Sequence, residues 1–100
     1  MKGWRLASLE GAIEQAAIEF YLLFWAAPRS ELLKELVMVV MQEGFLFVPF
    51  YPNRYQDHEP EALQIVGSNR MLTGRVRELF RPGLFDRDGG LRVPARVAVE

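Results

Sequence analysis

The sequence has no cysteine among its 100 residues. This absence excludes disulfide bonds, a thiolate nucleophile and any metal site that depends on thiolate ligands. Lysine is also scarce, with two residues against ten arginines, and a GC-rich bacterial coding sequence would produce that bias. We therefore expect a bacterial protein whose fold depends on its apolar core and not on covalent cross-links.

Long uncharged segments are missing as well. The two longest, residues 20–28 and 44–53, are far shorter than the ~20 residues that cross a bilayer. Glu10, Glu14 and Glu19 interrupt any apolar segment that a signal peptide would need. These features predict a cytoplasmic protein with no membrane partner.

The overall composition is that of an ordinary folded domain. Half of the residues are apolar, a quarter are charged, and the formal net charge is −1. The length supports one compact domain over residues 1–100, and the near-neutral charge argues against bulk nucleic acid or an anionic membrane as partner. No spacing typical of a nucleotide-binding loop or a catalytic triad occurs in the sequence. Composition therefore favours no class of enzyme, and we expect neither a cofactor nor a metal site.

The first helix is predicted over residues 8–27. This segment contains no proline, Ser8 can act as its N-cap, and Pro28 follows its end. At 100° per residue, one apolar stripe runs along the helix and is expected to face the core. Its members are Leu9, Ala12, Ile13, Ala16, Ala17, Phe20, Leu23, Phe24 and Ala27.

The opposite face of this helix changes character half-way along. Its first half is polar and consists of Glu10, Gly11, Glu14 and Gln15. Its second half is apolar and consists of Ile18, Tyr21, Leu22 and Trp25. Either another part of the chain covers these four side chains, or they form an exposed apolar patch that marks an association site. The favoured function is a non-enzymatic, self-associating or protein-binding module that uses this face, with a dimer as the expected assembly.

The remaining elements follow from local signals. Ser30 and Gly44 bracket a second helix at residues 31–43, and the short connection between the helices predicts an antiparallel hairpin. Strands are expected at residues 45–51, 62–67, 83–86 and 91–99, with a glycine-rich turn before the last strand. The expected fold class is α+β, with an N-terminal antiparallel helical hairpin packed on one face of a small, mostly antiparallel β-sheet of about four strands.

An arginine-rich segment gives the first alternative function. Thr73 can cap a short helix over residues 74–81, whose apolar side chains would point inward. Four arginines of this region could then contact phosphate groups of a nucleic acid, namely Arg70, Arg75, Arg77 and Arg81.

The single histidine gives the second alternative. His58 lies in a polar loop between Asp57 and Glu59, and its ordinary pKa near neutrality suits a proton-transfer role. A small-ligand pocket or an active site near His58 and Tyr55 would need a further carboxylate from elsewhere in the chain.

Overall fold

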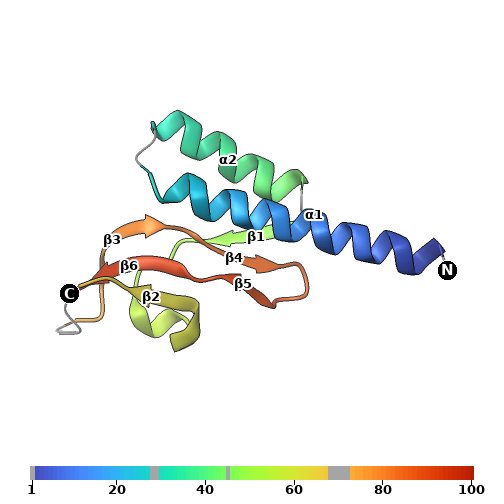
Figure 1. Cartoon of the computed structure of the whole chain (residues 1–100). Helices are drawn as coiled ribbons and strands as arrows, with labels where there is room; N and C mark the ends of the chain where they lie inside the picture. Colours follow the sequence, from blue (N-terminus) through green and yellow to red (C-terminus); the bar gives the residue numbers. More distant parts are fainter. Residues whose placement is uncertain (1, 28–29, 45, 68–72) are drawn as a thin grey trace. The chain divides into compact units, whose positions relative to one another are not determined.

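The computed structural model describes residues 2–27, 30–44, 46–67 and 73–100, with side-chain positions from residue 9 onward (Figure 1). Within these residues it contains two α-helices, two short 3₁₀ helices and six strands, so the predicted α+β class is confirmed. The chain divides into two compact units, Met1–Phe45 and Leu46–Glu100. We refer to them as the helical unit and the strand unit, and describe each by itself.

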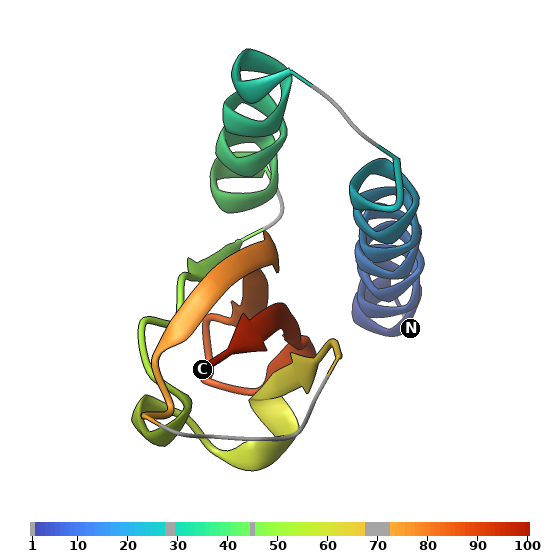
Figure 2. The same cartoon turned by 90° about the vertical axis from the view of Figure 1, so that its left-hand side faces the viewer.

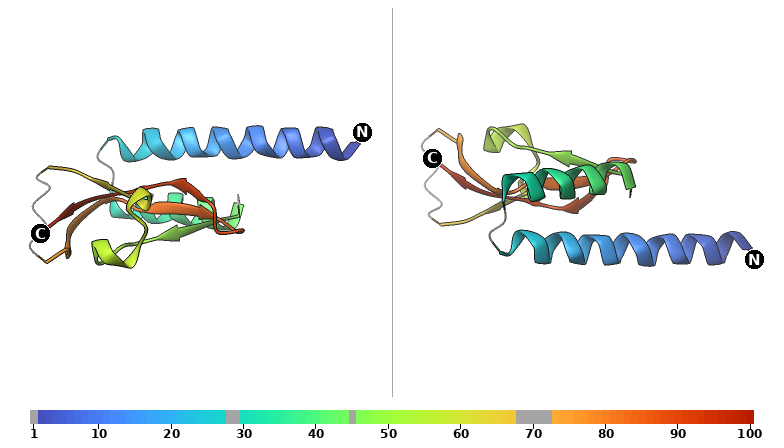
Figure 3. Two further views of the ribbon diagram at one scale, coloured as in Figure 1. Left: turned by 90° about the horizontal axis from the view of Figure 1, so that it is seen from below. Right: turned by 90° about the horizontal axis from the view of Figure 1, so that it is seen from above.

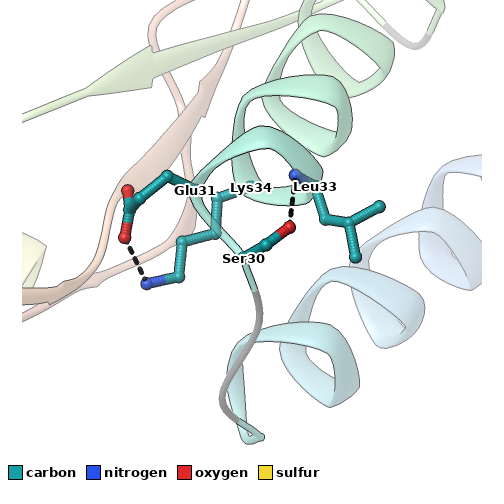
Figure 4. Close-up of polar contacts among 4 residues, drawn as sticks. All are labelled: Ser30, Glu31, Leu33 and Lys34. Carbon is teal, nitrogen blue, oxygen red and sulfur yellow. Dashed lines mark hydrogen bonds and ion pairs between the residues drawn. The ribbon is translucent and has the colours of Figure 1, made fainter.

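The helical unit consists of α1 (Lys2–Trp25) and α2 (Glu31–Gly44). α1 begins six residues earlier than predicted, so Ser8 lies inside the helix and is not its N-cap. α2 agrees with the sequence signals at both ends. Ser30 Oγ accepts a hydrogen bond from the Leu33 N–H at 3.2 Å, and Lys34 Nζ lies 3.2 Å from Glu31 Oε1 one turn along (Figure 4). The cap supplies a partner for one N–H group that a helix start would otherwise leave unpaired.

The two helices run in opposite directions, as predicted for a hairpin (Figures 1 and 3). The Tyr21 hydroxyl donates a hydrogen bond to Met38 Sδ at 3.5 Å, and Lys34 Nζ lies 5.5 Å from the centre of the Trp25 ring. A step of four residues towards the C-terminus of α1, from Tyr21 to Trp25, therefore corresponds to a step of four residues towards the N-terminus of α2. That relation holds only for antiparallel neighbours.

The strand unit contains six strands in two three-stranded sheets. Their bounds are β1 (Phe47–Phe50), β2 (Leu63–Ile65), β3 (Val76–Arg81), β4 (Gly83–Asp86), β5 (Leu91–Val93) and β6 (Ala95–Val99). One sheet has the order β1-β4-β5 and is antiparallel, and the other has the order β2-β6-β3, in which only the β2–β6 pair is parallel. The strand pairing is therefore mostly antiparallel, as predicted. The strands form two sheets and not one, and there are six of them where about four were expected.

Two prolines explain the division into two sheets. Only Pro82 separates β3 from β4, and only Pro94 separates β5 from β6, so these strands are the halves of one long hairpin (Figure 2). Leu79 pairs with Val97 on one side of the prolines, and Leu84 pairs with Val93 on the other. Proline has no N–H group to donate to a strand ladder, so the ladder is interrupted at both positions.

The predicted helix over residues 74–81 is wrong, because Val76–Arg81 forms β3. The pairing of β3 with β6 shifts register twice, between Val76 and Glu78 and between Leu79 and Arg81. Each shift inserts one extra residue into β3, so Val76 and Leu79 both lie against the core although they are three residues apart. A spacing of three is also that of one helical face, which is why the sequence pattern favoured a helix.

The core of the strand unit gathers around Phe50. Its ring stacks on Phe85 with 4.4 Å between the ring centres, and the His58 ring lies 5.0 Å from it on another side. The other buried members of the cluster come from β2, β6 and the short helix before β2, and they are Ala62, Leu63, Ala95, Val97 and Val99. In β6, Ala95, Val97 and Val99 thus belong to the core, and Ala98 between the last two is also buried.

The turn at the end of the long hairpin agrees with the sequence prediction. Asp86 Oδ1 accepts hydrogen bonds from the N–H groups of Asp88 at 3.0 Å and Gly90 at 2.8 Å. Gly89 has φ +87°, a conformation that favours glycine. The aspartate and the glycine together fix the turn that brings β4 and β5 side by side.

Candidate interaction surface on the helical unit

The apolar face of α1 that contains Ile18, Tyr21, Leu22 and Trp25 is largely buried. Ile18 has 6% of its surface exposed and Tyr21 has none, while Trp25 is half-buried and Leu22 remains exposed. Tyr21 and Trp25 contact Met38 and Lys34 of α2, respectively. Ile18 and Tyr21 therefore follow the first of the two alternatives, in which another part of the chain covers them, and α2 supplies the contact at Tyr21.

The stripe expected to face the core is instead largely exposed. Leu9, Ile13, Phe20 and Leu23 leave between 46% and 73% of their surface exposed, whereas Ala17 and Phe24 from the same predicted stripe are buried. The assignment of these four large side chains to the core is therefore wrong. α1 has two apolar faces on roughly opposite sides, and periodicity alone does not say which of them α2 contacts.

The exposed face has the residue spacing of a helix-packing seam. Leu9, Ile13, Ala16, Phe20 and Leu23 follow one another at intervals of four, three, four and three residues. This spacing repeats every 3.5 residues on average, as the core positions of paired helices do. We call these five residues the outer seam. This spacing is present in the sequence, but it does not indicate an interface as long as the whole stripe is assigned to the core.

The buried face of α1 has the same kind of spacing. Glu14, Ile18, Tyr21 and Trp25 follow one another at intervals of four, three and four residues, and we call them the inner seam. Two of its members make the contacts to α2 described above. Each seam of this spacing suits one neighbouring helix, and α2 already occupies the inner seam.

α2 also exposes an apolar face. Met38 and Met41 are buried on one side of it, and Leu36 lies two residues from Met38, which places it on roughly the opposite side at 100° per residue. The exposed apolar residues of α2 are Leu32, Leu33, Leu36, Val39 and Val40, each with about half or more of its surface exposed. The helical unit thus carries most of the large apolar side chains that the described residues expose.

The charges around this surface are mainly carboxylates. Between residues 9 and 25, α1 carries Glu10, Glu14 and Glu19 and no basic residue. On α2, Glu31, Glu35 and Glu43 accompany a single Lys34. The outer seam itself contains no charged residue, so it can bind only through apolar contact.

Among the arginines proposed for nucleic-acid binding, Arg75, Arg77 and Arg81 do not lie on a helix. Arg70 is outside the described residues, while Arg75 and Arg77 are exposed in and beside β3. The Arg81 guanidinium donates hydrogen bonds to Gln64 Oε1 at 3.3 Å and to the Pro94 carbonyl oxygen at 2.9 Å. Arg81 therefore joins β3 to the proline break beside β6, which is a structural role.

The surroundings of His58 are those of a packed loop. Tyr55 begins the short helix η1 (Tyr55–Asp57), packs against the apolar core cluster, and donates its N–H to the Gly74 carbonyl oxygen at 2.7 Å. His58 packs its ring against Phe50. Among the described residues, no three His, Asp or Glu side chains gather as metal ligands would.

The chain matches no protein-family model, and neither the curated proteins nor the solved structures contain a significant match to it. In the part of the chain that the structure describes, no helix combines the length and apolarity needed to cross a membrane.

Proposed function

We propose that the protein is a non-enzymatic protein-binding module whose helical unit supplies the binding surface. The observation that carries the proposal is the outer seam, which is apolar, exposed and spaced for a neighbouring helix. The proposed interface thereby differs from the sequence-based one at Ile18, Tyr21, Leu22 and Trp25, and lies on the opposite face of the same helix.

The spacing of the seam supports a helix as the binding element. Side chains at intervals of four and three residues insert between those of a second helix, whereas an extended strand alternates with a period of two. The inner seam already packs against a helix within the chain, because it contacts α2 at Tyr21 and Trp25. A helix with two such seams is typical of a bundle in which each helix has two neighbours.

The size of the exposed side chains supports a binding role as well. Complete burial of a leucine, isoleucine or phenylalanine stabilises a protein by about 1.5–3 kcal/mol. The four large side chains of the outer seam each leave 46–73% of their surface exposed, so covering them would contribute roughly 1–2 kcal/mol apiece. Part of this gain offsets the entropy lost on association, which predicts moderate affinity.

The flanking carboxylates disfavour other occupants of this surface. Helices that lie on anionic lipid carry Lys and Arg beside their apolar face, and α1 carries only Glu between residues 9 and 25. Nucleic acid would be repelled by the same groups. The proposed compartment is the cytoplasm, and the sequence composition supports this part of the proposal.

Site-specific photo-cross-linking tests the proposed surface. The photoreactive amino acid benzoylphenylalanine replaces Phe20 in the outer seam or, as a matched control, Gln15 on the polar face of the same helix. After irradiation of bacterial cells that express the protein, we expect a discrete protein adduct from position 20 and little from position 15. Equal yields from the two positions would contradict the proposal.

A further inference from the structure

We infer that the outer seam of α1 binds the outer seam of a second copy of this chain, with the two helices antiparallel and Ala16 at the two-fold axis. This inference rests on the proposed function and names its partner. A second copy offers a helix of the same length and the same apolar surface, as a symmetric interface requires.

The order of side chains along the seam is self-complementary. Read from either end, it gives two large residues, one small residue and two large residues. Antiparallel pairing about Ala16 places Leu9 beside Leu23 of the second copy, and Ile13 beside Phe20 of the second copy. Every large side chain then meets another large one, and the two alanines meet at the centre.

Ala16 suits the position on the axis because it is the smallest member of the seam. Helix axes pack 8–10 Å apart, and the distance depends on the side chains at the crossing point. Two facing alanines allow the helix axes to approach to about 8 Å. The flanking leucine, isoleucine and phenylalanine side chains can then interdigitate on both sides. A large residue at position 16 would hold the helices apart.

The area of the seam predicts a weak dimer. Four large side chains, with 46–73% of their surface exposed, offer on the order of a few hundred Å² per copy. Standard stable interfaces bury about 800 Å² per partner, and smaller ones form weak or transient complexes. We therefore expect a dissociation constant in the micromolar range, so dimerisation depends on concentration.

Sedimentation or light scattering of the purified full chain tests this inference, at concentrations from about 1 to about 300 µM around the expected midpoint. The mass should rise from that of the 11.5 kDa chain towards twice that value. Phe20→Glu should remain monomeric, and Gln15→Glu, which adds the same charge on the polar face, should dimerise normally. Circular dichroism of both variants checks that the helices remain folded.

Disulfide cross-linking tests the orientation without placing a charge in the seam. Because the chain has no cysteine, Ala16→Cys introduces the only thiol, and it should form a cross-linked dimer under mild oxidation. Leu9→Cys should not, because antiparallel pairing about Ala16 separates the two copies of residue 9 by about 20 Å along the axis.

The outcomes separate this inference from the proposed function. A chain that stays monomeric throughout and gives no Ala16→Cys cross-link overturns the second copy as partner. A photo-cross-link from Phe20 to another protein would then leave the proposed function standing. Cross-linking of Leu9→Cys as efficiently as Ala16→Cys overturns the antiparallel arrangement.

Discussion

The ring of Phe50 lies over Gly83, its pairing partner between β1 and β4. A side chain at position 83 would occupy the space that the Phe50 ring atoms fill. Phe50 in turn stacks on Phe85 and lies at the centre of the strand unit's core. A glycine inside a strand weakens it locally, but here it allows the aromatic ring to cross the neighbouring strand and close the core.

Gly83→Ala should therefore destabilise the strand unit. The added methyl group forces the Phe50 ring out of its packed position, and overpacking of this kind costs about 1–3 kcal/mol. The free energy of unfolding, from urea titration, measures the effect. Gly11→Ala is the matched control: nothing lies within 4 Å of a methyl group at position 11, and alanine in a helix interior is favoured by roughly 0.5–1 kcal/mol. Equal effects of the two substitutions would contradict the role assigned to Gly83.

Asp86 should stabilise the turn between β4 and β5 through its side chain. Asp86→Ala removes the oxygen that accepts hydrogen bonds from the Asp88 and Gly90 N–H groups, and we expect a loss of about 1–2 kcal/mol. Asp88→Ala provides the control, since Asp88 enters this hydrogen-bonded turn through its backbone N–H. Urea unfolding of both variants compares them, and a larger effect from Asp88→Ala would reverse the assignment.

Ser30 should contribute to the start of α2 through its hydroxyl oxygen. Ser30→Ala removes the acceptor for the Leu33 N–H, and loss of such a cap costs about 1 kcal/mol. Ser30→Asp keeps an acceptor at the same position and adds a charge that the helix N-terminus favours. Thermal unfolding followed by circular dichroism should place Ser30→Asp above Ser30→Ala. The opposite order would show that the cap is dispensable.

The elements predicted correctly are those that depend on local chemistry. Ser30 and Gly44 mark the ends of α2 because capping involves residues within one turn of the helix end. The turn after Asp86 was predictable for the same reason, since its hydrogen bonds and its positive φ angle lie within five residues. The α+β class followed from the order of these elements along the chain.

The faces of α1 could not be predicted in the same way. Leu9 and Ile18 lie on opposite sides of α1, on seams with the same kind of spacing, and only the contact with α2 decides which seam is buried. A hydrophobic pattern reports that a face prefers to be covered, but it does not identify the neighbour. The sequence therefore indicates that α1 has surplus apolar surface, but not which of its two faces remains exposed.

Leu79 and Phe80 distinguish the observed strand from the helix that the sequence favoured. In a helix over residues 74–81 both side chains would lie on the apolar face, whereas in β3 Leu79 packs on the core and Phe80 is exposed. Leu79→Ala should therefore cost about 2 kcal/mol, and Phe80→Ala, at a ring with 38% of its surface exposed, about 1 kcal/mol. Urea titration of the two variants measures both values, and a larger loss for Phe80→Ala would favour the helix.

The salt dependence of association should distinguish the outer seam from a charged interface. No residue of the seam is charged, and between residues 9 and 25 the charges on α1 are all carboxylates. Between about 0.05 and about 0.5 M NaCl, screening of these carboxylates should tighten the dimer slightly, by less than roughly threefold. Binding of an oligonucleotide through Arg75 and Arg77 would instead weaken steeply, because salt competes with each phosphate contact. Sedimentation at both salt concentrations measures the dimer, and a strong weakening by salt would indicate that ion pairs, and not Leu9, Ile13, Phe20 and Leu23, hold the two copies together.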